Sequence, residues 1–365
     1  MSEWQTFCLK DLGKIVGGTT PPTNNPKNYG NKIAWITPKD LSTLQGRYIK
    51  KGSRSISRLG FKSCSCVLLP KHAILFSSRA PIGYVAIAEK RLCTNQGFKS
   101  IIPNKKIYFE FLYYLLKYHK DNISNIGGGT TFKEVSGATL GLFEVKIPPT
   151  YYEQQKIART LSVLDQKIEN NHKINELLHN LAHKVYEYYF KYKPKNAKLE
   201  QIIIENPKSS IMVKNAQKTQ DKYPFFTSGD NTLSYPKAII DGRNCFLNTG
   251  GNAGIKFYVG KASYSTDTWC IGTNEFSDYL YLLLSSIKTY INQSFFQGTS
   301  LKHLQKNLLK KYPIYMPSVH EIKKFNQIIM PLLTLISINT RISKKLEQIR
   351  DFLLPLLLKQ QVKPQ

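Results

Sequence analysis

Two short phrases of the chain carry hydroxyl and ammonium groups directly after a glycine. They are Gly129-Thr130-Thr131-Phe132-Lys133 and Gly298-Thr299-Ser300-Leu301-Lys302, and the second follows the first at an offset of 169 (298 − 129). Groups of this kind on glycine-containing loops suit the binding of an anion, because backbone amides can approach it closely. The glycines Gly127 to Gly129 are not followed by the Lys-Ser/Thr pair of a nucleotide-binding loop, so a binding surface is the better prediction.

This offset belongs to a longer internal repeat. Ile147-Pro148-Pro149 returns as Met316-Pro317-Ser318 at the same offset, and Thr37-x-x-Asp40 returns as Thr227-x-x-Asp230 at an offset of 190. Offsets that change along the chain indicate loops of different length between shared elements. This period is far longer than the roughly 20–50 residues of a solenoid repeat. The sequence therefore predicts two diverged copies of one module.

The charge of the chain indicates a polyanionic partner. Its 365 residues include 52 Lys and Arg against 24 Asp and Glu, which gives a net charge of +28. An excess of this size favours nucleic acid as the partner, although a merely basic protein is the simpler alternative. The length allows two or three domains, each with its own core.

Residues that would carry catalysis do not form a recognisable pattern. We find no Walker loop, no dinucleotide-type glycine motif and no Asn/Asp-Pro-Pro-Tyr methyltransferase element. The histidines and cysteines show no metal-ligand spacing, so no metal site is expected. Glu144-x-Lys146 has the form of a nuclease Glu-x-Lys pair, but no convincing partner acid precedes it. We expect no catalytic residues.

The elements that must position the polar phrases are short strands with one helix per copy. In residues 1–150, apolar runs are bounded by Gly, Pro, Asn and Ser, and a helix is expected near Phe109 to Tyr118. Residues 194–318 repeat this plan, with a helix near Tyr279 to Tyr290. Long helical patterns over 151–193 and 319–365 follow the two copies. The chain is thus expected to be an α+β protein with two mixed α/β domains, each followed by a long helix.

The apolar residues of both long segments are spaced like the seam of a coiled coil, alternating three and four residues. The predicted seam of the second segment comprises Phe325, Ile328, Leu332, Leu335, Asn339, Ile342, Leu346, Ile349, Leu353 and Leu356. That of the first comprises Ile157, Leu164, Asn171, Ile174, Leu178, Leu181, Val185 and Tyr188. Pro331 is expected to bend the second helix and Pro355 to end it.

Asn171 and Asn339 lie near the middle of these two segments. Antiparallel packing of the helices would place the two asparagines opposite each other, where a buried polar pair can fix the register. The alternative is that each asparagine is half exposed and merely tolerated.

No membrane or export segment is apparent. The N-terminus lacks a basic region followed by an apolar one, and the most apolar stretches are shorter than the roughly 20 residues of a membrane span. We therefore expect a cytoplasmic protein that does not bind membranes.

Several phrases resemble the specificity subunits of type I restriction–modification enzymes. They are Trp35-Ile36-Thr37-Pro38-Lys39-Asp40-Leu41, Ser77-Ser78-Arg79-Ala80-Pro81-Ile82-Gly83, Thr94-Asn95-Gln96-Gly97 and Ile147-Pro148-Pro149-x3-Glu153-Gln154-Gln155-Lys156-Ile157. The resemblance covers essentially the whole chain. The second copy departs from it in Thr227-Ser228-Gly229-Asp230, Thr266-Asp267-Thr268 and Glu321-Ile322-Lys323-Lys324.

This resemblance implies a non-catalytic subunit that binds double-stranded DNA. Each domain would be a target recognition domain that reads one half of an asymmetric, bipartite site. The two helices would form an antiparallel coiled-coil spacer that docks two methyltransferase subunits, with restriction subunits joining the complex. No cofactor is expected on this chain, and S-adenosylmethionine, ATP and Mg would be bound by the partner subunits.

Base edges and phosphates are contacted by cations, amides and hydroxyls presented on loops. In the first domain the candidates for DNA binding are Lys39, Arg79, Asn95, Gln96, Thr130, Thr131 and Lys133. In the second domain they are Arg243, Asn248, Thr249, Asn252, Thr299, Ser300 and Lys302. Asn can instead close turns, and Thr130 or Thr299 can instead cap a helix, so a structural role competes at these positions.

Three other functions remain open from the sequence. A type II system would use a similar subunit with a fused nuclease–methyltransferase. A nonspecific nucleic-acid-binding protein would depend on charge alone and would bind all sequences with a steep salt dependence. A coiled-coil scaffold would assemble with a partner and would not bind DNA.

Overall fold

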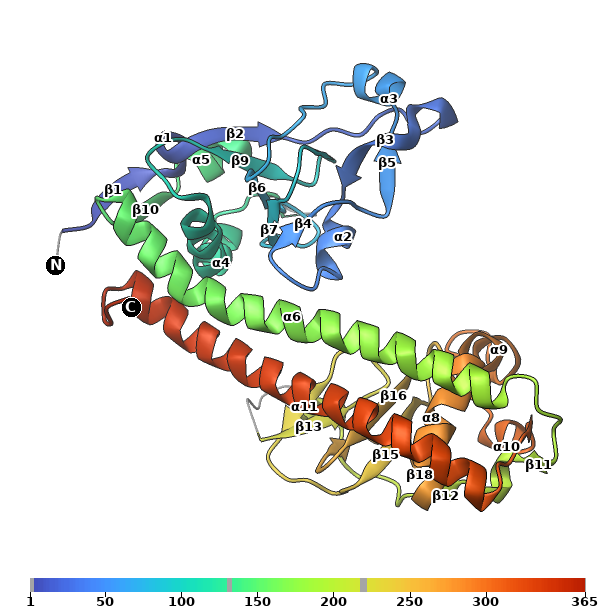
Figure 1. Cartoon of the computed structure of the whole chain (residues 1–365). Helices are drawn as coiled ribbons and strands as arrows, with labels where there is room; N and C mark the ends of the chain where they lie inside the picture. Colours follow the sequence, from blue (N-terminus) through green and yellow to red (C-terminus); the bar gives the residue numbers. More distant parts are fainter. Residues whose placement is uncertain (1–2, 130–132, 217–221, 365) are drawn as a thin grey trace. The chain divides into compact units, whose positions relative to one another are not determined.

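The computed structural model describes residues 3–129, 133–216 and 222–364. These residues form two compact units, which we call unit 1 (residues 1–170 and 343–365) and unit 2 (residues 171–342). Each unit contains one set of sheets and parts of both long helices, α6 (Tyr151–Phe190) and α11 (Val319–Leu358) (Figure 1).

The remaining elements of unit 1 precede α6. They are β1 (Gln5–Cys8), α1 (Leu9–Leu12), β2 (Gly13–Gly17), the 3-10 helix η1 (Pro26–Asn28), β3 (Tyr29–Ile36), α2 (Pro38–Ser42), β4 (Tyr48–Ile49), β5 (Arg54–Ile56), α3 (Arg58–Lys62), β6 (Ile74–Phe76), β7 (Val85–Ala88), β8 (Cys93–Thr94), β9 (Lys99–Pro103), α4 (Phe109–Asn125), α5 (Gly137–Gly141) and β10 (Glu144–Ile147).

The remaining elements of unit 2 lie between the long helices. They are β11 (Ala197–Lys198), the 3-10 helix η2 (Leu199–Gln201), β12 (Ile204–Glu205), α7 (Val213–Ala216), β13 (Tyr223–Phe226), β14 (Leu233–Tyr235), β15 (Arg243–Asn248), β16 (Ile255–Val259), β17 (Ser263–Tyr264), β18 (Thr268–Gly272), the 3-10 helix η3 (Asn274–Phe276), α8 (Ser277–Ser286), α9 (Lys288–Ser294), β19 (Phe296–Gln297), β20 (His303–Leu304), α10 (Lys306–Lys310) and β21 (Pro313–Ile314).

The two sets of sheets share one topology. The order β2-β9-β6-β7-β4 in unit 1 corresponds to β12-β18-β15-β16 in unit 2, where the strand equivalent to β4 is lacking among the described residues. The order β5-β3-β8 corresponds to β14-β13-β17, and in both sheets the first pair is antiparallel and the second parallel. The pair β1-β10 corresponds to β11-β21. The predicted duplication is therefore confirmed by the order and direction of the shared strands.

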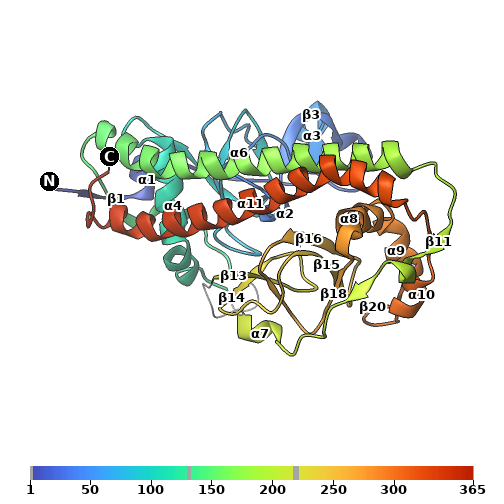
Figure 2. The same ribbon diagram turned by 60° about the horizontal axis from the view of Figure 1, so that its bottom comes forward.

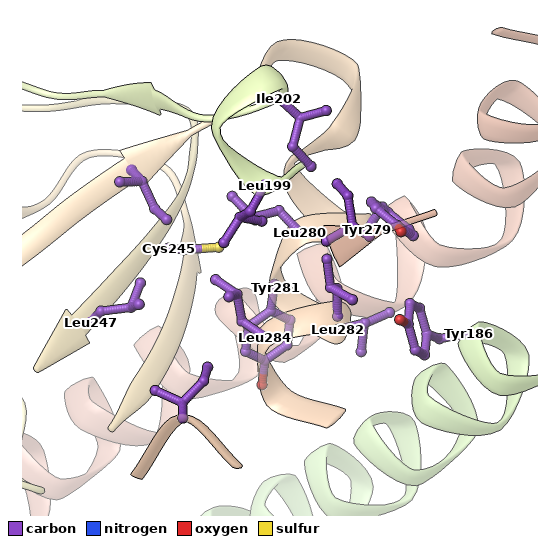
Figure 3. Packing of buried hydrophobic residues seen from close by; sticks show 14 of the residues in the cluster. Tyr186, Leu199, Ile202, Cys245, Leu247, Tyr279, Leu280, Tyr281, Leu282 and Leu284 are labelled. Atoms are coloured by element: carbon purple, nitrogen blue, oxygen red, sulfur yellow. The ribbon is translucent and has the colours of Figure 1, made fainter. Parts of the chain in front are cut away.

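One helix covers the larger sheet of each unit. The predicted helix near Phe109 is α4, whose apolar residues Phe111, Leu112, Leu115 and Leu116 are buried against β6 and β7. The predicted helix near Tyr279 is α8, which packs on β15 and β16 (Figure 2) and is followed by the separate α9. In unit 2 this core also receives Tyr186 from α6 and Leu199 from η2 (Figure 3).

Both long helices are 40 residues long, and the start of α11 follows that of α6 at an offset of 168 (319 − 151). In unit 1 the first part of α6 shares a core with the last part of α11, as at Leu161 and Leu357. In unit 2 the last part of α6 contacts the first part of α11, where the rings of Phe190 and Phe325 lie 4.9 Å apart. Within each unit the helices are thus antiparallel, as predicted.

The predicted seam is wrong in several positions. Ile328, Leu335 and Ile342 keep 42%, 41% and 44% of their surface exposed. Phe325 and Asn339 of the predicted seam are buried, but the other buried residues in this part of α11 are Ile322, Ile329, Leu333, Ile336, Ser337 and Ser343. The buried face is displaced because α11 packs against the sheets of its unit as well as against α6, and such a face is wider than a two-helix seam. The prediction for Pro355 is also wrong, because α11 continues to Leu358.

A buried network of charges joins the sheets of unit 1 to both helices. The Arg47 guanidinium donates to Glu110 (2.9 Å) and to Glu169 of α6 (3.1 Å). On the same side of α6, Asp165 accepts hydrogen bonds from Tyr114 of α4 (2.5 Å) and from Arg350 of α11 (2.6 Å). Burial lowers the pKa of Arg47, but Tyr114 and the carboxylates of Glu169 and Glu110 raise it above its usual value, so the guanidinium stays charged.

Because Asp165 is buried, its charge should contribute strongly to the stability of unit 1. Removing one partner of a buried ion pair costs roughly 3–5 kcal/mol, since the other charge stays buried without compensation. We therefore expect Asp165→Asn to lower the free energy of unfolding of the chain, measured by urea denaturation, by roughly 3 kcal/mol.

The matched control is Asp351→Asn, since Asp351 also binds Arg350 but its side chain is 58% exposed. Exposed ion pairs contribute about 0–1 kcal/mol. Equal, small losses for the two variants would contradict a stabilising role of the buried network.

Candidate nucleic-acid interface

Two parallel strands of unit 1 bring the segments 37–40 and 94–97 to the same edge of their sheet. β3 and β8 run in the same direction with Ile36 opposite Thr94, so the residues that follow them emerge at the same end. The amide of Asn95 donates to the carbonyl of Ile36 (3.0 Å). Lys39, in the first turn of α2, and Gln96, in the loop after β8, therefore lie at the same end of these strands, and both are exposed.

Two further loops join this edge through backbone hydrogen bonds. The amide of Ser78 donates to the carbonyl of Gly97 (2.8 Å), and the amide of Val135 donates to the carbonyl of Ser78 (3.0 Å). The described candidates of the first domain, including Arg79 and Lys133, are thus on four loops in contact. We call segments 37–40 (the start of α2), 77–83, 94–97, 127–129 and 133–135 the first reading edge.

Unit 2 forms the same edge with the same bonds. The amide of Ser265 donates to Phe226 (2.9 Å), that of Thr249 to Asp267 (3.2 Å), and that of Leu304 to Thr249 (3.0 Å). We call loops 227–230, 248–254, 265–268 and 297–303 the second reading edge. Thr249 corresponds to Ser78 at an offset of 171 (249 − 78), and Ser265 corresponds to Asn95 at an offset of 170 (265 − 95).

The start of α2, which carries Lys39, is fixed by a carboxylate that our site prediction did not include. Asp40 accepts hydrogen bonds from the amide of Thr37 (2.8 Å), the hydroxyl of Thr37 (2.7 Å) and the amide of Ser53 (2.7 Å). Burial raises the pKa of the Asp40 carboxyl, but the hydrogen bonds from Ser53 and Thr37 outweigh it and hold that pKa below its usual value. The Thr-x-x-Asp spacing of a capping box was the sequence signal for this role.

The candidates divide by exposure. The exposed ones are Lys39, Gln96, Lys133, Asn252, Thr299, Ser300 and Lys302. The side chain of Arg79 is 38% exposed and lies 3.5 Å from Glu134, a carboxylate that Lys99 also contacts at 3.2 Å. Thr130 and Thr131 lie outside the described residues. Exposed cations and hydroxyls on one edge suit contacts to phosphates and base edges.

Other candidates hold the loops together. The side-chain oxygen of Asn95 accepts from the amide of Gly97 (3.0 Å), and that of Gln96 accepts from the hydroxyl of Thr20. Asn248 is buried and donates to the carbonyl of Asn252 (3.1 Å), while Thr249 donates to the carbonyl of Asp267 (2.7 Å). The expected competition between binding and turn formation is thus visible at these positions.

Arg243 makes structural contacts that argue against its assignment to DNA binding. Its guanidinium forms a two-pronged ion pair with the buried carboxylate of Asp278 on α8 and donates to the hydroxyl of Thr334 on α11 (2.9 Å). A bidentate pair of this kind uses the geometry for which Arg is suited, and it leaves the side chain little exposed. Arg243 therefore joins the sheet of unit 2 to its helices.

Asn339 is buried and hydrogen-bonded, but through a different residue than predicted. Its amide donates to the side-chain oxygen of Asn175 (2.9 Å), which lies one helical turn after Asn171. Asn175 in turn donates to the hydroxyl of Thr340 (3.4 Å). A polar contact between the helices therefore exists in unit 2, and a role of Asn171 or Asn339 in the register stays a prediction.

Lys256 is a half-buried cation beside the second reading edge that sequence reasoning missed. Its ammonium contacts the carbonyls of Thr227 (2.6 Å) and Gly229 and the side chain of Asn248 (3.3 Å). Burial lowers the pKa of the Lys256 ammonium, and the carboxylates of Asp230 and Asp267 partly offset this effect. It fixes two of the loops relative to each other, and its position on a strand gave no signal of this role.

The described residues show neither a metal-binding cluster nor a membrane-spanning helix. Among residues 3–129, 133–216 and 222–364, no group of three His, Cys, Asp or Glu side chains is arranged to hold a metal ion. Within the same ranges, no helix is long and apolar enough to span a membrane.

Comparison with known proteins agrees with the duplicated architecture. The family model for the type I restriction modification DNA specificity domain matches residues 1–180 and again residues 195–348. The type I restriction enzyme MjaIX specificity subunit of Methanocaldococcus jannaschii is 33% identical over 409 residues, covering 97% of this chain and 92% of the relative. The HindI specificity subunit of Haemophilus influenzae is 31% identical over 46% of this chain and 37% of its own length.

A solved structure has the same fold. The crystal structure of a type I restriction–modification S subunit from M. genitalium matches 98% of this chain and 96% of that chain, with a TM-score of 0.64 and 18% identity. The two matches to the family model together extend over most of the chain. The chain therefore belongs to the type I restriction modification DNA specificity family.

Proposed function

We propose that this chain is the DNA-specificity subunit of a type I restriction–modification complex and reads an asymmetric, bipartite site. The observation that carries this proposal is the duplicated reading edge, in which the same backbone hydrogen bonds hold four loops in each unit. One edge would contact each half of the site. Loops that are built alike but carry different side chains suit two binding surfaces of different specificity.

The side chains at equivalent positions of the two edges differ in chemistry. Asn95 and Gln96 correspond to Ser265 and Thr266, and Arg79 corresponds to Gly250 at the offset of 171. An amide can bind adenine through two hydrogen bonds and Arg can bind guanine in the same way, whereas a hydroxyl is less selective and glycine has no side chain. The two half-sites are therefore expected to differ.

Charge alone would not distinguish this function from nonspecific binding. The net charge of +28 supports attraction to any nucleic acid. A specific reader additionally requires polar groups on a rigid frame, and Asp40 and Lys256 supply such fixed points at the two edges. The specific function is thus better supported than the nonspecific one.

We further propose that the chain itself carries no catalytic group. S-adenosylmethionine, ATP and Mg would be bound by the partner subunits. Glu144 and Lys146, the pair with a nuclease-like spacing, lie on β10 opposite Cys8 and Thr6, on elements that do not contribute to the first reading edge.

The long helices offer a surface for the methyltransferase subunits. Ile328, Leu335 and Ile342 are spaced by seven residues on α11 and are exposed. Leu181 and Tyr188 follow Ile174 at the same spacing on α6 and are exposed as well. An apolar stripe with a period of seven residues suits packing against an apolar face of another protein. This stripe supports the docking of methyltransferase subunits, with restriction subunits joining the complex.

Arg79→Ala should weaken recognition of one half-site only. Loss of a good Arg contact to a base costs about 1–3 kcal/mol, which corresponds to roughly tenfold or more in affinity. The measurement is binding of the assembled complex to three duplexes, one with the full site and one with each half replaced. In the variant, replacing the first half should cost less than in the wild type, while replacing the second half should cost as much as before.

Lys302→Ala is the reciprocal control, because Lys302 is exposed on the second reading edge. It should affect only discrimination of the second half. Equal losses for both halves with Arg79→Ala would mean that Arg79 acts through general electrostatics or through folding.

Leu335→Asp should impair assembly without impairing folding. The residue is 41% exposed, so a charge there is tolerated in the isolated chain but would be buried without a partner in a docked complex. We expect co-purification with the methyltransferase to fall at least tenfold while the thermal midpoint of the isolated chain changes little. Gln327→Asp, which adds the same charge at an exposed polar position of α11, should assemble normally. Normal assembly of Leu335→Asp would exclude this stripe as the docking surface.

A further inference from the structure

A cavity of about 250 Å³ lies beside the second reading edge. It is lined by the reading-edge residues Thr249, Thr266 and Thr268 together with Glu205, Lys208, Trp269 and Lys306 among others. Thr249 is also the residue through which two of the loops of that edge are hydrogen-bonded. The cavity is therefore part of the frame that presents the second set of candidate DNA contacts.

The cationic groups of this cavity exceed its anionic groups. The carboxylate of Glu205 is engaged, because one oxygen contacts Lys310 and the other accepts from the indole of Trp269 (2.8 Å). Within the described part of the chain, neither Lys208 nor Lys306 forms an ion pair. Two ammonium groups thus remain without a carboxylate of their own.

The ammonium of Lys306 is held over an aromatic ring. It lies 5.1 Å from the ring centroid of Trp269, and Lys310 lies 5.9 Å from the same ring. An aromatic face attracts a cation but does not neutralise it. Burial lowers the pKa of Lys306, Glu205 raises it, and the neighbouring charges of Lys208 and Lys310 lower it further. An anion in the cavity would relieve this repulsion.

Unit 1 has an equivalent short helix and equivalent strands at this position, but it lacks the lysine side chains of α10. α5 and α10 are both five residues long, and Gly137 and Gly141 of α5 correspond to Lys306 and Lys310 at an offset of 169. Ile15 pairs with Ile101 as Glu205 pairs with Ile271, so Ile15 takes the place of Glu205. Lys99 correspondingly takes the place of Trp269 (269 − 99 = 170). The ammonium of Lys99 is paired with Glu134 (3.2 Å), so among the described residues the arrangement of Lys306 and Lys310 beside an aromatic ring belongs to the second copy.

We propose that this cavity binds one backbone phosphate of the DNA half-site read by unit 2, with Lys208 and Lys306 as the cations. This inference rests on the proposed function, since it assigns part of the same DNA interface. A phosphate carries the charge that two ammonium groups require, and the hydroxyls of a reading edge can donate to its oxygens. Because unit 1 lacks these groups, the second half of the site would be bound with one more phosphate contact than the first at this position.

The test is binding of the assembled complex to its duplex over a range of salt concentrations. Lys306→Ala should weaken binding about tenfold at low salt, because hydrogen bonds to charged groups are among the stronger ones. It should also reduce the slope of log K against log[salt] by about 0.9, the value for one phosphate contact. Discrimination between sequences should be unchanged. Lys261→Ala, at the exposed turn before β17 and thus at the opposite end of that strand from the reading edge, is the matched control and should keep the wild-type slope.

Neutral methylphosphonate linkages placed one at a time in the duplex identify the phosphate. One linkage in the second half-site should weaken binding of the wild type but have no further effect on Lys306→Ala.

An unchanged slope and affinity for Lys306→Ala, in a complex that still recognises its site, would overturn the inference and leave the proposed function intact. A wild-type complex that recognises no sequence would instead contradict the proposed function. A changed base preference in Lys306→Ala would show that the cavity reads a base, which overturns the inference. If no linkage matters while inorganic phosphate alone changes the fluorescence of Trp269, the cavity binds free phosphate, which also overturns the inference.

Discussion

Two strands that run in the same direction end at the same edge, and each half of this protein depends on that constraint. In unit 1 the segments that follow β3 and β8 begin side by side, and in unit 2 the same holds for the segments that follow β13 and β17. The amides of Asn95 and Ser265 then bind the carbonyl of the neighbouring strand. Since these bonds involve only backbone atoms, the side chains of the loops are free to differ between the copies. The same frame can therefore support two specificities.

Charged side chains fix these frames to the long helices. In unit 1, Arg47 and Asp165 form a buried network with Glu110, Glu169 and Arg350. In unit 2, Arg243 binds Asp278 on one side and Thr334 of α11 on the other. Buried ion pairs are specific in their geometry, because their desolvation is compensated only when the partners fit. In each unit an arginine thus links the sheets, which hold the reading edge, to the helices.

The repeat made much of the fold predictable from the sequence. The offset of 190 between Thr37 and Thr227 and the offset of 169 near Gly129 both reappear as corresponding backbone contacts. The helix positions followed from apolar spacing, which is a local property. The seam on α11 was mispredicted because two apolar faces overlap on that helix, and spacing alone does not show which one is buried.

The roles of individual side chains were less predictable, because they depend on residues that are distant in sequence. Arg243 had the residue type expected for a DNA contact, but Asp278 occupies its guanidinium. Asn248 was expected to be a loop amide that contacts DNA, but its side chain is buried and donates a hydrogen bond to the carbonyl of Asn252 in the following loop. The cavity at Lys306 was not anticipated at all, since it requires Glu205, Trp269 and α10 to meet.

The central claim is that this chain determines a bipartite DNA site. The most direct measurement is single-molecule methylome sequencing of cells that co-express the chain with a methyltransferase subunit that assembles with it. We expect a split motif with methylated adenine in both halves, which is absent when the chain is omitted. A continuous motif, or an unchanged methylome from a methyltransferase shown to be active, would contradict it.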